Sequence, residues 1–518
     1  MLVVTGYRIF DGLRFDKKIE AIAIDQDRIV AVGKKTEILA LATSSKEIIN
    51  FPDQIIMPGI TDAHIHLLHY GRSLEVLNCE TDTKLACLSL VRNQVNILSP
   101  GKWIIGHGWN QNIWQDGKPT RKELDAVSPE NPVYLTDKSL HSVWVNTLAL
   151  EYAGINAQTA DPPGGTIGRD NTGELDGILY ENATQLVNSV LPEPTDSEMM
   201  QLLIKAQAAL IRQGITAVHD FDNWQVFKVL KDLDTNRNLL LKIVKNIPCE
   251  NLDDAIHQKS YSGMQIGRLT LGWLKLFSDG ALGPQTAALF APYSGTMNVG
   301  KLLLEEEHIV SIGKKAAQAN IALAIHAIGD LATHVSLNAL ACIKDCNDAL
   351  ILKPRFEHAQ LVSPGDFTRF GELGIIASMQ PIHAISDQVT AEKYWGERCV
   401  TSYAWQSMLN EGITMAFGSD APVEDPNPVK GIRAAIWRKT MQYPNGWHPE
   451  QQLTLEQALR AFTSTPAKIA GCSQEFGTIK PGRKADIVVY PKSVFNSESS
   501  NVIPTGVMID GQWVIQNS

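Results

Sequence analysis

Through the middle of the chain, short apolar runs alternate with segments of helical periodicity. The segments 199–211 and 309–319, for example, place apolar residues three and four positions apart, as amphipathic helices do. Strands that alternate with helices indicate a parallel sheet, and eight such units predict a closed (β/α)₈ TIM barrel. The eight strand-like runs are 58–66, 214–220, 239–244, 271–277, 322–326, 355–358, 374–379 and 413–420.

The two ends of the chain contain short strand-like runs without helices between them. In residues 1–57 these runs are 2–4, 21–24 and 28–33, and residues 475–518 hold two more, 485–490 and 507–515. Neither end alone has enough strands to cover a hydrophobic face. We therefore expect both ends to pack into one small β-sandwich beside the barrel.

An insertion interrupts the alternation after the first barrel strand. It covers residues 67–194, and the rest of the barrel follows at 195–474. The runs 103–110, 132–137 and 141–146 give the insertion strands of its own. Because it starts directly after the first barrel strand, we expect its base to stand near the active site, where loops of this length are often functional. The alternative is a peripheral packing or dimer element.

Composition and charge narrow the class of protein. The chain has 518 residues, 44% of them hydrophobic and 20% charged, which is typical of a globular protein. Its net charge of -10 argues against nucleic acid as a partner, because phosphate backbones require basic patches. The oligomeric state is left open, with a homodimer as the candidate.

The cysteines and the N-terminal residues bear on the compartment. Seven cysteines form no CxxC pair, so the sequence indicates neither a disulfide framework nor a cysteine zinc knuckle. One helical face is predicted to carry Cys342 and Cys346 into the core. The first residues lack the pattern of a signal peptide, and no apolar run is long enough to cross a membrane. We expect a cytoplasmic protein without a membrane anchor.

Six potential metal ligands occur at or just after the ends of strand-like runs. In a (β/α)₈ barrel these ends meet at one mouth, so residues far apart in sequence converge there. His64 and His66 are two positions apart, so both side chains project from the same face of an extended strand. The alternative of unrelated core residues does not explain the shared position. The six residues are His64, His66, Lys275, His326, His358 and Asp420.

Several motifs resemble the amidohydrolase superfamily, and within it the YtcJ-like and N-substituted formamide deformylase-like hydrolases. The resemblance spans nearly the whole chain, and it depends on the order and spacing of the motifs together. They are PGITDAHIH at 58–66, LKLFSDGALG at 274–283, HAIGD at 326–330, EHAQ at 357–360, QPIH at 380–383 and FGSD at 417–420.

The resemblance implies a two-metal site. It assigns His64 and His66 to one divalent ion and His326 and His358 to the other. A carboxylated Lys275 would bridge the ions, and Asp420 would complete the first. Imidazole and carboxylate ligands favour zinc, with manganese, iron or cobalt as alternatives. The other interpretation of Lys275 is an ordinary lysine paired with an acidic group such as Asp279, which would leave a mononuclear site.

The implied reaction is hydrolysis of the C–N bond of an amide or formamide-like small molecule by metal-activated hydroxide. Asp420 would accept the proton of the attacking water and pass it to the departing amine. Hydrolysis of a lactone or ester, deamination, and a catalytically silent metal-binding regulatory protein are the alternatives. Cytosine-deaminase-like chemistry is disfavoured, because Gly329 stands where the His-x-x-Glu motif of those relatives has its glutamate.

Three further histidines are candidates for substrate binding. His219 ends the second barrel strand and His383 follows the seventh, so both can face the barrel mouth. His141 lies in the insertion. For each, the alternative is a hydrogen-bonded structural histidine.

Overall fold

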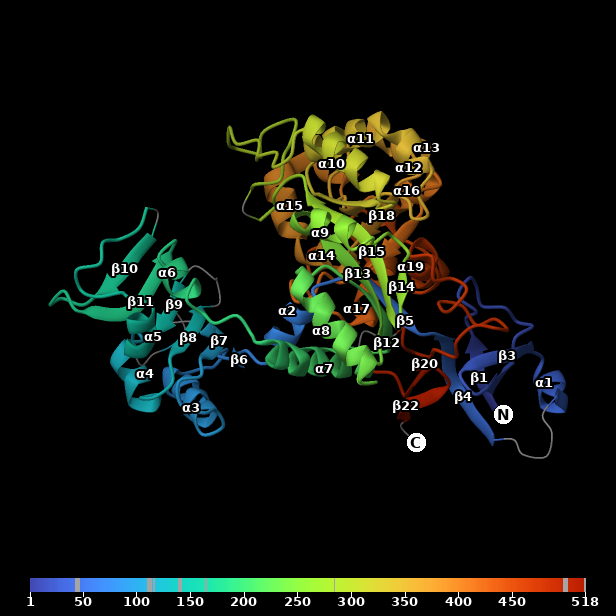
Figure 1. Ribbon diagram of the computed structural model, residues 1–518, viewed down its shortest axis with the longest axis horizontal. Coiled ribbons are helices and arrows are strands. Elements are labelled where there is room, and N and C mark those ends of the chain that lie inside the picture. Colours follow the sequence, from blue (N-terminus) through green and yellow to red (C-terminus); the bar gives the residue numbers. More distant parts are fainter. Residues whose placement is uncertain are drawn as a thin grey trace. The chain divides into compact units, whose positions relative to one another are not determined.

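The computed structural model describes residues 1–41, 47–109, 114, 117–137, 142–163, 165–283, 285–496 and 502–516. These residues form two compact units. The first consists of residues 1–71 and 199–518, and the second of residues 72–198. The first unit holds a barrel and a sheet that is built from both ends of the chain (Figure 1).

Eight parallel strands form the barrel, which confirms the (β/α)₈ fold predicted from the alternation of strands and helices. Their residues are predominantly apolar, and β-branched side chains favour the extended backbone. A short strand, β14 (Gln265–Ile266), adds an antiparallel partner to β15. The eight strands are β5 (Ile60–Ile65), β12 (Ile215–Asp220), β13 (Lys242–Pro248), β15 (Leu269–Phe277), β16 (Leu323–Ala327), β17 (Arg355–His358), β18 (Ile376–Met379) and β19 (Met415–Phe417).

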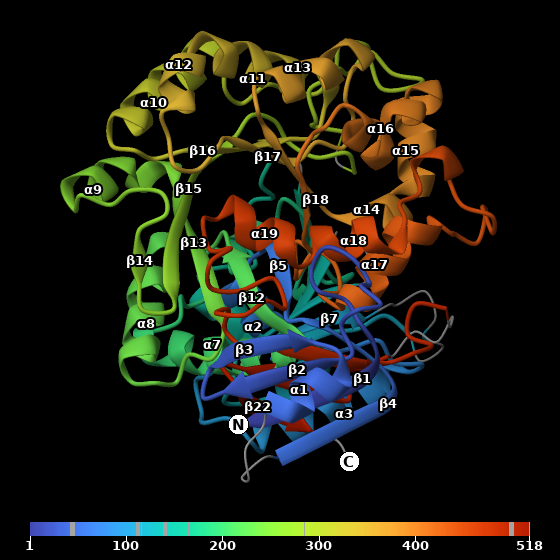
Figure 2. The ribbon, with the colours of Figure 1, turned by 90° about the vertical axis from the view of Figure 1, so that its right-hand side faces the viewer.

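Helices follow the barrel strands and cover the outside of the sheet (Figure 2). Their apolar stripes supply the outer layer of the core, as in α10, where Ile309, Gly313 and Ala316 are buried three and four residues apart. The principal helices are α7 (Asp196–Arg212), α8 (Trp224–Thr235), α9 (Leu252–His257), α10 (Glu306–Gln318), α11 (Asp330–Cys342), α12 (Lys344–Asp348), α13 (Phe367–Glu372), α14 (Pro381–Ser386), α15 (Gln388–Trp395), α16 (Trp405–Asn410), α17 (Pro428–Trp437), α18 (Leu455–Ala461) and α19 (Ser464–Ile469).

The barrel closes between β5 and the segment that follows β19. The backbone N–H of Asp420 donates to the His64 carbonyl at 2.7 Å, and the N–H of His66 donates to the Ala421 carbonyl at 2.9 Å. Gly418 permits this approach, because a Cβ there would lie only 2.3 Å from the His64 nitrogen. The closure therefore holds the first pair of histidines against Asp420.

Asp62 stabilises the same closure from inside. Its carboxylate accepts hydrogen bonds from the Ser419 hydroxyl at 2.5 Å, the Ser419 N–H at 3.0 Å and the His64 N–H at 3.0 Å. The side chain is buried, so these bonds replace the water that ionised carboxylates otherwise require.

Seven strands from both ends of the chain form the second sheet of the first unit. The long strand β4 pairs in parallel with β1 and antiparallel with β20, so it joins the N-terminal strands to the C-terminal ones. In sheet order the strands are β22 (Gln512–Gln516), β21 (Gly506–Ile509), β20 (Ile487–Pro491), β4 (Glu47–Pro58), β1 (Leu2–Ile9), β2 (Ala21–Asp25) and β3 (Arg28–Gly33), with α1 (Lys35–Leu41) after β3.

Ion pairs attach this sheet to the barrel at the amino end of β13. The Lys242 ammonium lies 2.6 Å from an Asp486 oxygen and 3.1 Å from an Asp510 oxygen. The Arg268 guanidinium also contacts the Asp510 carboxylate. Because these pairs lie at the amino ends of the strands, they leave the carboxyl ends free for the candidate site.

The second unit contains a six-stranded sheet with helices of its own. Three buried tryptophans, Trp109, Trp114 and Trp144, pack with ring centroids 6.0–6.2 Å apart and form part of its core. Its elements in sheet order are β10 (Gly165–Arg169), β11 (Leu175–Glu181), β9 (Ser142–Val145), β8 (Val133–Asp137), β7 (Ile104–Trp109) and β6 (Leu77–Asn78), with helices α3 (Lys84–Val95), α4 (Arg121–Val127), α5 (Thr147–Tyr152) and α6 (Thr184–Asn188).

One expectation about the cysteines is wrong. Cys342 and Cys346 are exposed rather than buried on a shared face. The reason is a break in the helix: α11 ends at Cys342, Ile343 leaves the helical conformation with φ −118°, and Cys346 belongs to the separate helix α12.

Among the residues described here, no helix combines the length and the apolar character needed to span a bilayer.

The Asp62 contacts predict a stability effect. Asp62→Ala removes three hydrogen bonds to a buried carboxylate and leaves their donors unsatisfied, so we expect the free energy of unfolding to fall by about 3 kcal/mol. Urea unfolding of metal-free protein, followed by tryptophan fluorescence, measures the change. Asp62→Asn keeps one acceptor oxygen and should lose less. A change below about 0.5 kcal/mol in the alanine variant would show that closure does not depend on Asp62.

Candidate metal centre

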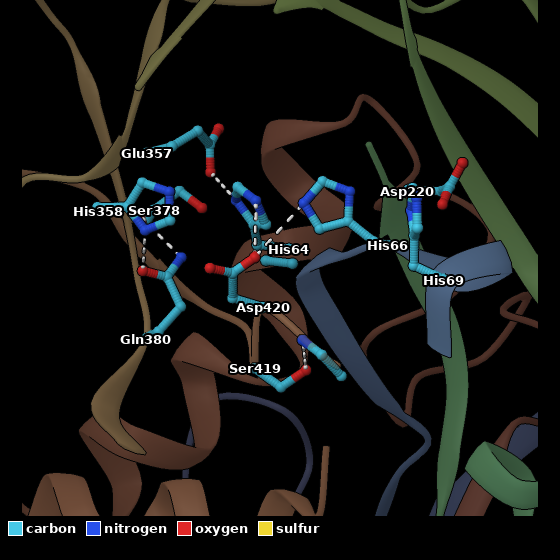
Figure 3. A network of polar contacts seen from close by, with 12 residues as sticks. His64, His66, His69, Asp220, Glu357, His358, Ser378, Gln380, Ser419 and Asp420 are labelled. Carbon is cyan, nitrogen blue, oxygen red and sulfur yellow. Dashed lines mark hydrogen bonds and ion pairs between the residues drawn. The ribbon is translucent and has the colours of Figure 1, made fainter. Parts of the chain in front are cut away.

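The six predicted ligands line one cavity of about 290 Å³ at the carboxyl ends of the barrel strands. The first pair comes from the end of β5, and the others come from four further positions around the barrel. Figure 3 shows His64, His66, His358 and Asp420 directed toward one another. The six, with their elements, are His64 (β5), His66 (after β5), Lys275 (β15), His326 (β16), His358 (β17) and Asp420 (after β19).

Asp420 lies at the centre of the first group of ligand atoms. The Nε2 atoms of His64 and His66 are each 3.5 Å from its Oδ1 atom. These distances exceed those of ordinary hydrogen bonds, which are about 2.7–3.2 Å. They are close to the separation of roughly 3.3–3.4 Å between two ligand atoms of a tetrahedral zinc ion with bonds of about 2.0–2.1 Å. The three side chains therefore fit a divalent cation.

The backbone at Asp420 adopts a conformation that turns its carboxylate toward the histidines. Its φ of 62° lies in the left-handed region, which aspartate tolerates better than most residues. The strand β19 has ended three residues earlier, at Phe417. This turn explains why the ligand comes after the strand rather than from it.

Hydrogen bonds fix the tautomer of three histidines. The Nδ1–H of His64 donates to Glu357 Oε2 at 2.6 Å, and the Nδ1–H of His358 donates to Gln380 Oε1 at 2.9 Å. His326 uses the other nitrogen, because its Nε2–H donates to the Gly280 carbonyl at 2.9 Å. In each ring the remaining nitrogen keeps its lone pair, as a metal ligand requires.

The rings of these three histidines are also held neutral. Burial lowers the pKa of His64 and His358 well below the usual value, and the nearby Lys275 charge acts in the same direction on His64. For His326, burial and Lys275 lower the pKa to about 3. The rings of His326 and His358 are 4.5 Å apart between centroids. Neutral imidazoles this close offer a second pair of candidate nitrogen ligands beside the first.

Lys275 is buried in this cluster without a hydrogen-bond partner for its ammonium among the described residues. Its Nζ atom lies 4.8 Å from the ring centroid of Phe221 and 4.9 Å from that of Phe277. Burial lowers the pKa of Lys275 to about 8, although the charges of Glu357 and Asp420 oppose this shift. The side chain therefore exposes a partly neutral amine to the other ligands, and no ion pair with Asp279 is present.

A buried network behind His64 was not identified from the sequence. The Arg355 guanidinium donates to Glu357 Oε2 at 2.9 Å, to the Ala63 carbonyl at 2.8 Å and to the Ser378 hydroxyl at 2.5 Å. Arg355 and Glu357 are fully buried on β17. Two opposite charges two residues apart on a strand share one face, and that spacing was the available signal.

His66 has its own supporting carboxylate. Asp222, which follows β12, has an oxygen 3.7 Å from His66 Nδ1 and accepts a hydrogen bond from His69 Nδ1 at 2.6 Å. Its carboxylate also accepts the Leu68 N–H. Although burial opposes ionisation, the polar contacts with His66 and His69 hold the pKa of Asp222 well below its usual range. An anion is therefore fixed behind the second histidine of the pair.

The three predicted substrate-binding histidines have different positions. His383, on α14, lines the cavity, and its Nε2 atom is 3.9 Å from Asp420 Oδ2. His219 is fully buried on β12, where Arg355 donates to its Nδ1 atom at 2.9 Å, and it does not line the cavity. This position favours the structural alternative for His219. His141 lies outside the described residues.

Comparisons with known proteins agree with the motifs. The model of the amidohydrolase family matches residues 47–515. The Arabidopsis thaliana protein LONG AFTER FAR-RED 3 is 31% identical over 517 residues, which cover 97% of this chain and 89% of that protein. The Bacillus subtilis protein YtcJ is 28% identical and is covered over 99% of both chains. N-substituted formamide deformylase of Arthrobacter pascens is 27% identical over 91% of this chain and 90% of its own.

A solved structure extends the likeness to three dimensions. An uncharacterized metal-dependent hydrolase from Pyrococcus furiosus matches with a TM-score of 0.80 and 25% sequence identity. The match covers 95% of this chain and 99% of that one. Together with the family match, these relatives confirm the resemblance that the motifs indicate.

The contact between Glu357 and His64 predicts an effect on metal affinity. Glu357→Gln replaces the hydrogen-bond acceptor with a neutral amide and leaves Arg355 without its buried counter-charge. We expect zinc affinity to fall by about 10–100-fold, the range for groups that orient a ligand. Competition with a chromophoric chelator measures the affinity, and circular dichroism checks the fold. Glu372→Gln, on the outer helix α13, is a control for charge removal. Unchanged affinity in Glu357→Gln would contradict the positioning role.

Proposed function

The chain belongs to the amidohydrolase family and is a hydrolase that uses a divalent metal, and on this basis we propose that it cleaves the C–N bond of an amide or formamide-like small molecule. The observation that carries the proposal is the convergence of neutral histidines, an unpaired lysine and Asp420 on one cavity. The named activity of the Arthrobacter pascens relative, on N-substituted formamides, supports the choice of bond.

We assign the ligands to two ions. His64, His66 and Asp420 would hold the first, for which their atoms lie close enough to share one cation. His326 and His358 would hold the second through the nitrogens that their hydrogen bonds leave free. Zinc is the proposed metal, because the donors are imidazole nitrogens and carboxylate oxygens.

Lys275 would join the two sets of ligands as a carbamate. The neutral amine attacks the carbon of carbon dioxide, a C–N bond forms, and one proton leaves to solvent, which gives an anionic carbamate with two oxygens. The lowered pKa of Lys275 favours this reaction, because burial increases the fraction of neutral amine. Formation of the carbamate also removes the buried amine of Lys275, whose ammonium form is costly to bury without a partner.

The reaction would proceed through groups of the protein that hold and move protons. When bound, the divalent ions lower the pKa of water to near neutrality and polarise a carbonyl oxygen. Asp420 would accept the proton of the attacking water at its carboxylate and transfer it to the departing amine nitrogen. His383, whose Nδ1 atom accepts a hydrogen bond from Gln360 at 3.2 Å, would donate its Nε2–H to the substrate.

A screen of substrates tests the proposed function directly. Zinc-supplied protein is incubated with N-formyl, N-acyl and cyclic amides, and with matched esters and lactones. Release of amine from at least one N-formyl or N-acyl amide is the expected result. Turnover of esters or lactones alone would contradict the proposal and show that the protein cleaves C–O bonds.

Removal of Lys275 tests its role as a bridge. Lys275→Ala should lose metal and activity together, because the carbamate would be a ligand of both ions. Short carboxylic acids such as formate or acetate should restore part of the activity by occupying the vacated position. Elemental analysis and amide turnover are measured on the same samples. Full metal content and rate in the variant would show that the lysine is only structural.

Substitution of Asp420 separates proton transfer from metal binding. Asp420→Asn preserves the shape of the side chain and removes the proton acceptor, so kcat should fall at least about 100-fold when metal is in excess. The neutral oxygen is also a weaker ligand, so affinity for the first ion should decrease. Turnover within a few-fold of the unmodified protein would show that another residue is the base, with His383 the first to be examined.

A further inference from the structure

Beyond the metal ligands, the cavity has an apolar wall and an acidic part. Phe277, Leu282, Ile328 and Val423 supply the apolar wall. The charged side chains that line the cavity in the described part of the chain are acidic, apart from Lys275. If Lys275 is a carbamate, as the proposed function assigns, the lining retains no cationic side chain of its own.

Two buried polar atoms in the cavity lining lack hydrogen-bond partners, which favours a polar ligand. Gln360 Oε1 and His383 Nε2 have no hydrogen-bond partner among the described residues, and their side chains are only 3% and 7% exposed. An unsatisfied buried polar atom costs about 1–3 kcal/mol. Both residues line the cavity, so a bound amide group can supply the missing hydrogen bonds.

Asp387 and Glu424 form the acidic part of the same cavity, and both are half-buried. The Tyr403 hydroxyl donates to Asp387 Oδ2 at 2.7 Å, which leaves its other oxygen available. Burial and the neighbouring charge of Glu424 raise the pKa of Asp387 to about 6. The two carboxylates are therefore close enough to repel each other.

No cationic side chain in the described part of the chain forms an ion pair with Asp387 or Glu424. Asp425, the next acidic residue in the chain, differs from them in both respects. Its carboxylate lies 2.6 Å from the Lys430 ammonium, and it does not line the cavity. An anionic substrate group would be repelled by the uncompensated pair, whereas a cationic group would be attracted and would relieve the repulsion between the carboxylates.

We propose that the substrate carries a positively charged ammonium group that binds to Asp387 and Glu424, joined by an apolar segment to the amide that is cleaved. The apolar segment would contact the wall that contains Phe277 and Leu282. This inference rests on the proposed function for the amide end, and it adds the charge and the polarity of the rest of the substrate.

Three formamides of similar length test the charge preference. They are 5-formamidopentylamine, N-hexylformamide and 6-formamidohexanoate, which end in an ammonium, a methyl and a carboxylate group. We expect kcat/KM for the ammonium compound to exceed that of the neutral one by at least about tenfold, and the carboxylate compound to be poorest. Equal values for the three compounds, or a preference for the carboxylate, would overturn the inference and leave the proposed function intact.

The variant Glu424→Gln identifies the residue responsible. It should reduce the ratio of kcat/KM between the ammonium and neutral compounds at least about fivefold, mainly through KM, and improve the relative rate of the carboxylate compound. Asp425→Asn removes a neighbouring charge outside the cavity and should leave the ratio unchanged. An unchanged ratio in Glu424→Gln, or an equal loss in Asp425→Asn, would contradict the assignment.

A binding measurement separates this inference from the proposed function. Calorimetry with hexylammonium, hexanol and hexanesulfonate is performed on zinc-supplied protein and on Glu424→Gln. Tighter binding of hexylammonium that is weakened by the substitution supports the cation site even if no formamide is hydrolysed. Failure of hexylammonium to bind more tightly than hexanol would overturn the inference even if formamides are hydrolysed.

Discussion

The burial of several candidate metal-ligand side chains at one end of the barrel is the constraint on which the rest of the structure depends. Three imidazoles, an amine and a carboxylate are removed from water there, and desolvation disfavours the charged forms of His64, His326, His358, Lys275 and Asp420. Such a cluster is unfavourable by itself, because the buried Lys275 ammonium has no hydrogen-bond partner among the described residues. A shared cation would replace the contacts with water that these groups lose on burial.

The surrounding network makes this arrangement specific. Glu357 fixes the ring of His64, and Arg355 compensates the charge of Glu357 within the fully buried interior. Asp62 holds the backbone of His64 and Ser419 together, and so places the first histidine pair beside Asp420. The ligands are thus positioned by the closure of the barrel as well as by their own strands, which links the stability of the fold to the geometry of the site.

The sequence predicted the fold and the convergence of the six candidate ligands on one cavity, for physical reasons. Strands and helices leave different hydrophobic periods, and a parallel barrel brings the carboxyl ends of its strands together. This reasoning could not predict the tautomers of the histidines or the compensation of the buried Glu357 charge. Both depend on Arg355, Glu357 and Gln380, which act through contacts between different strands. The short strand β19 and the left-handed turn at Asp420 also depend on barrel closure rather than on local propensity. The acidic part of the cavity, at Asp387 and Glu424, lies on loops that no periodicity describes.

The number of divalent ions bound per chain tests the central claim most directly. Protein purified with a sufficient supply of zinc, passed through a desalting column and examined by elemental analysis should retain close to two ions per chain, because two sets of nitrogen ligands flank Lys275. A value near one would contradict the bridged pair and leave Lys275 as an unmodified lysine. A value near zero would contradict the interpretation of the buried cluster as a metal centre.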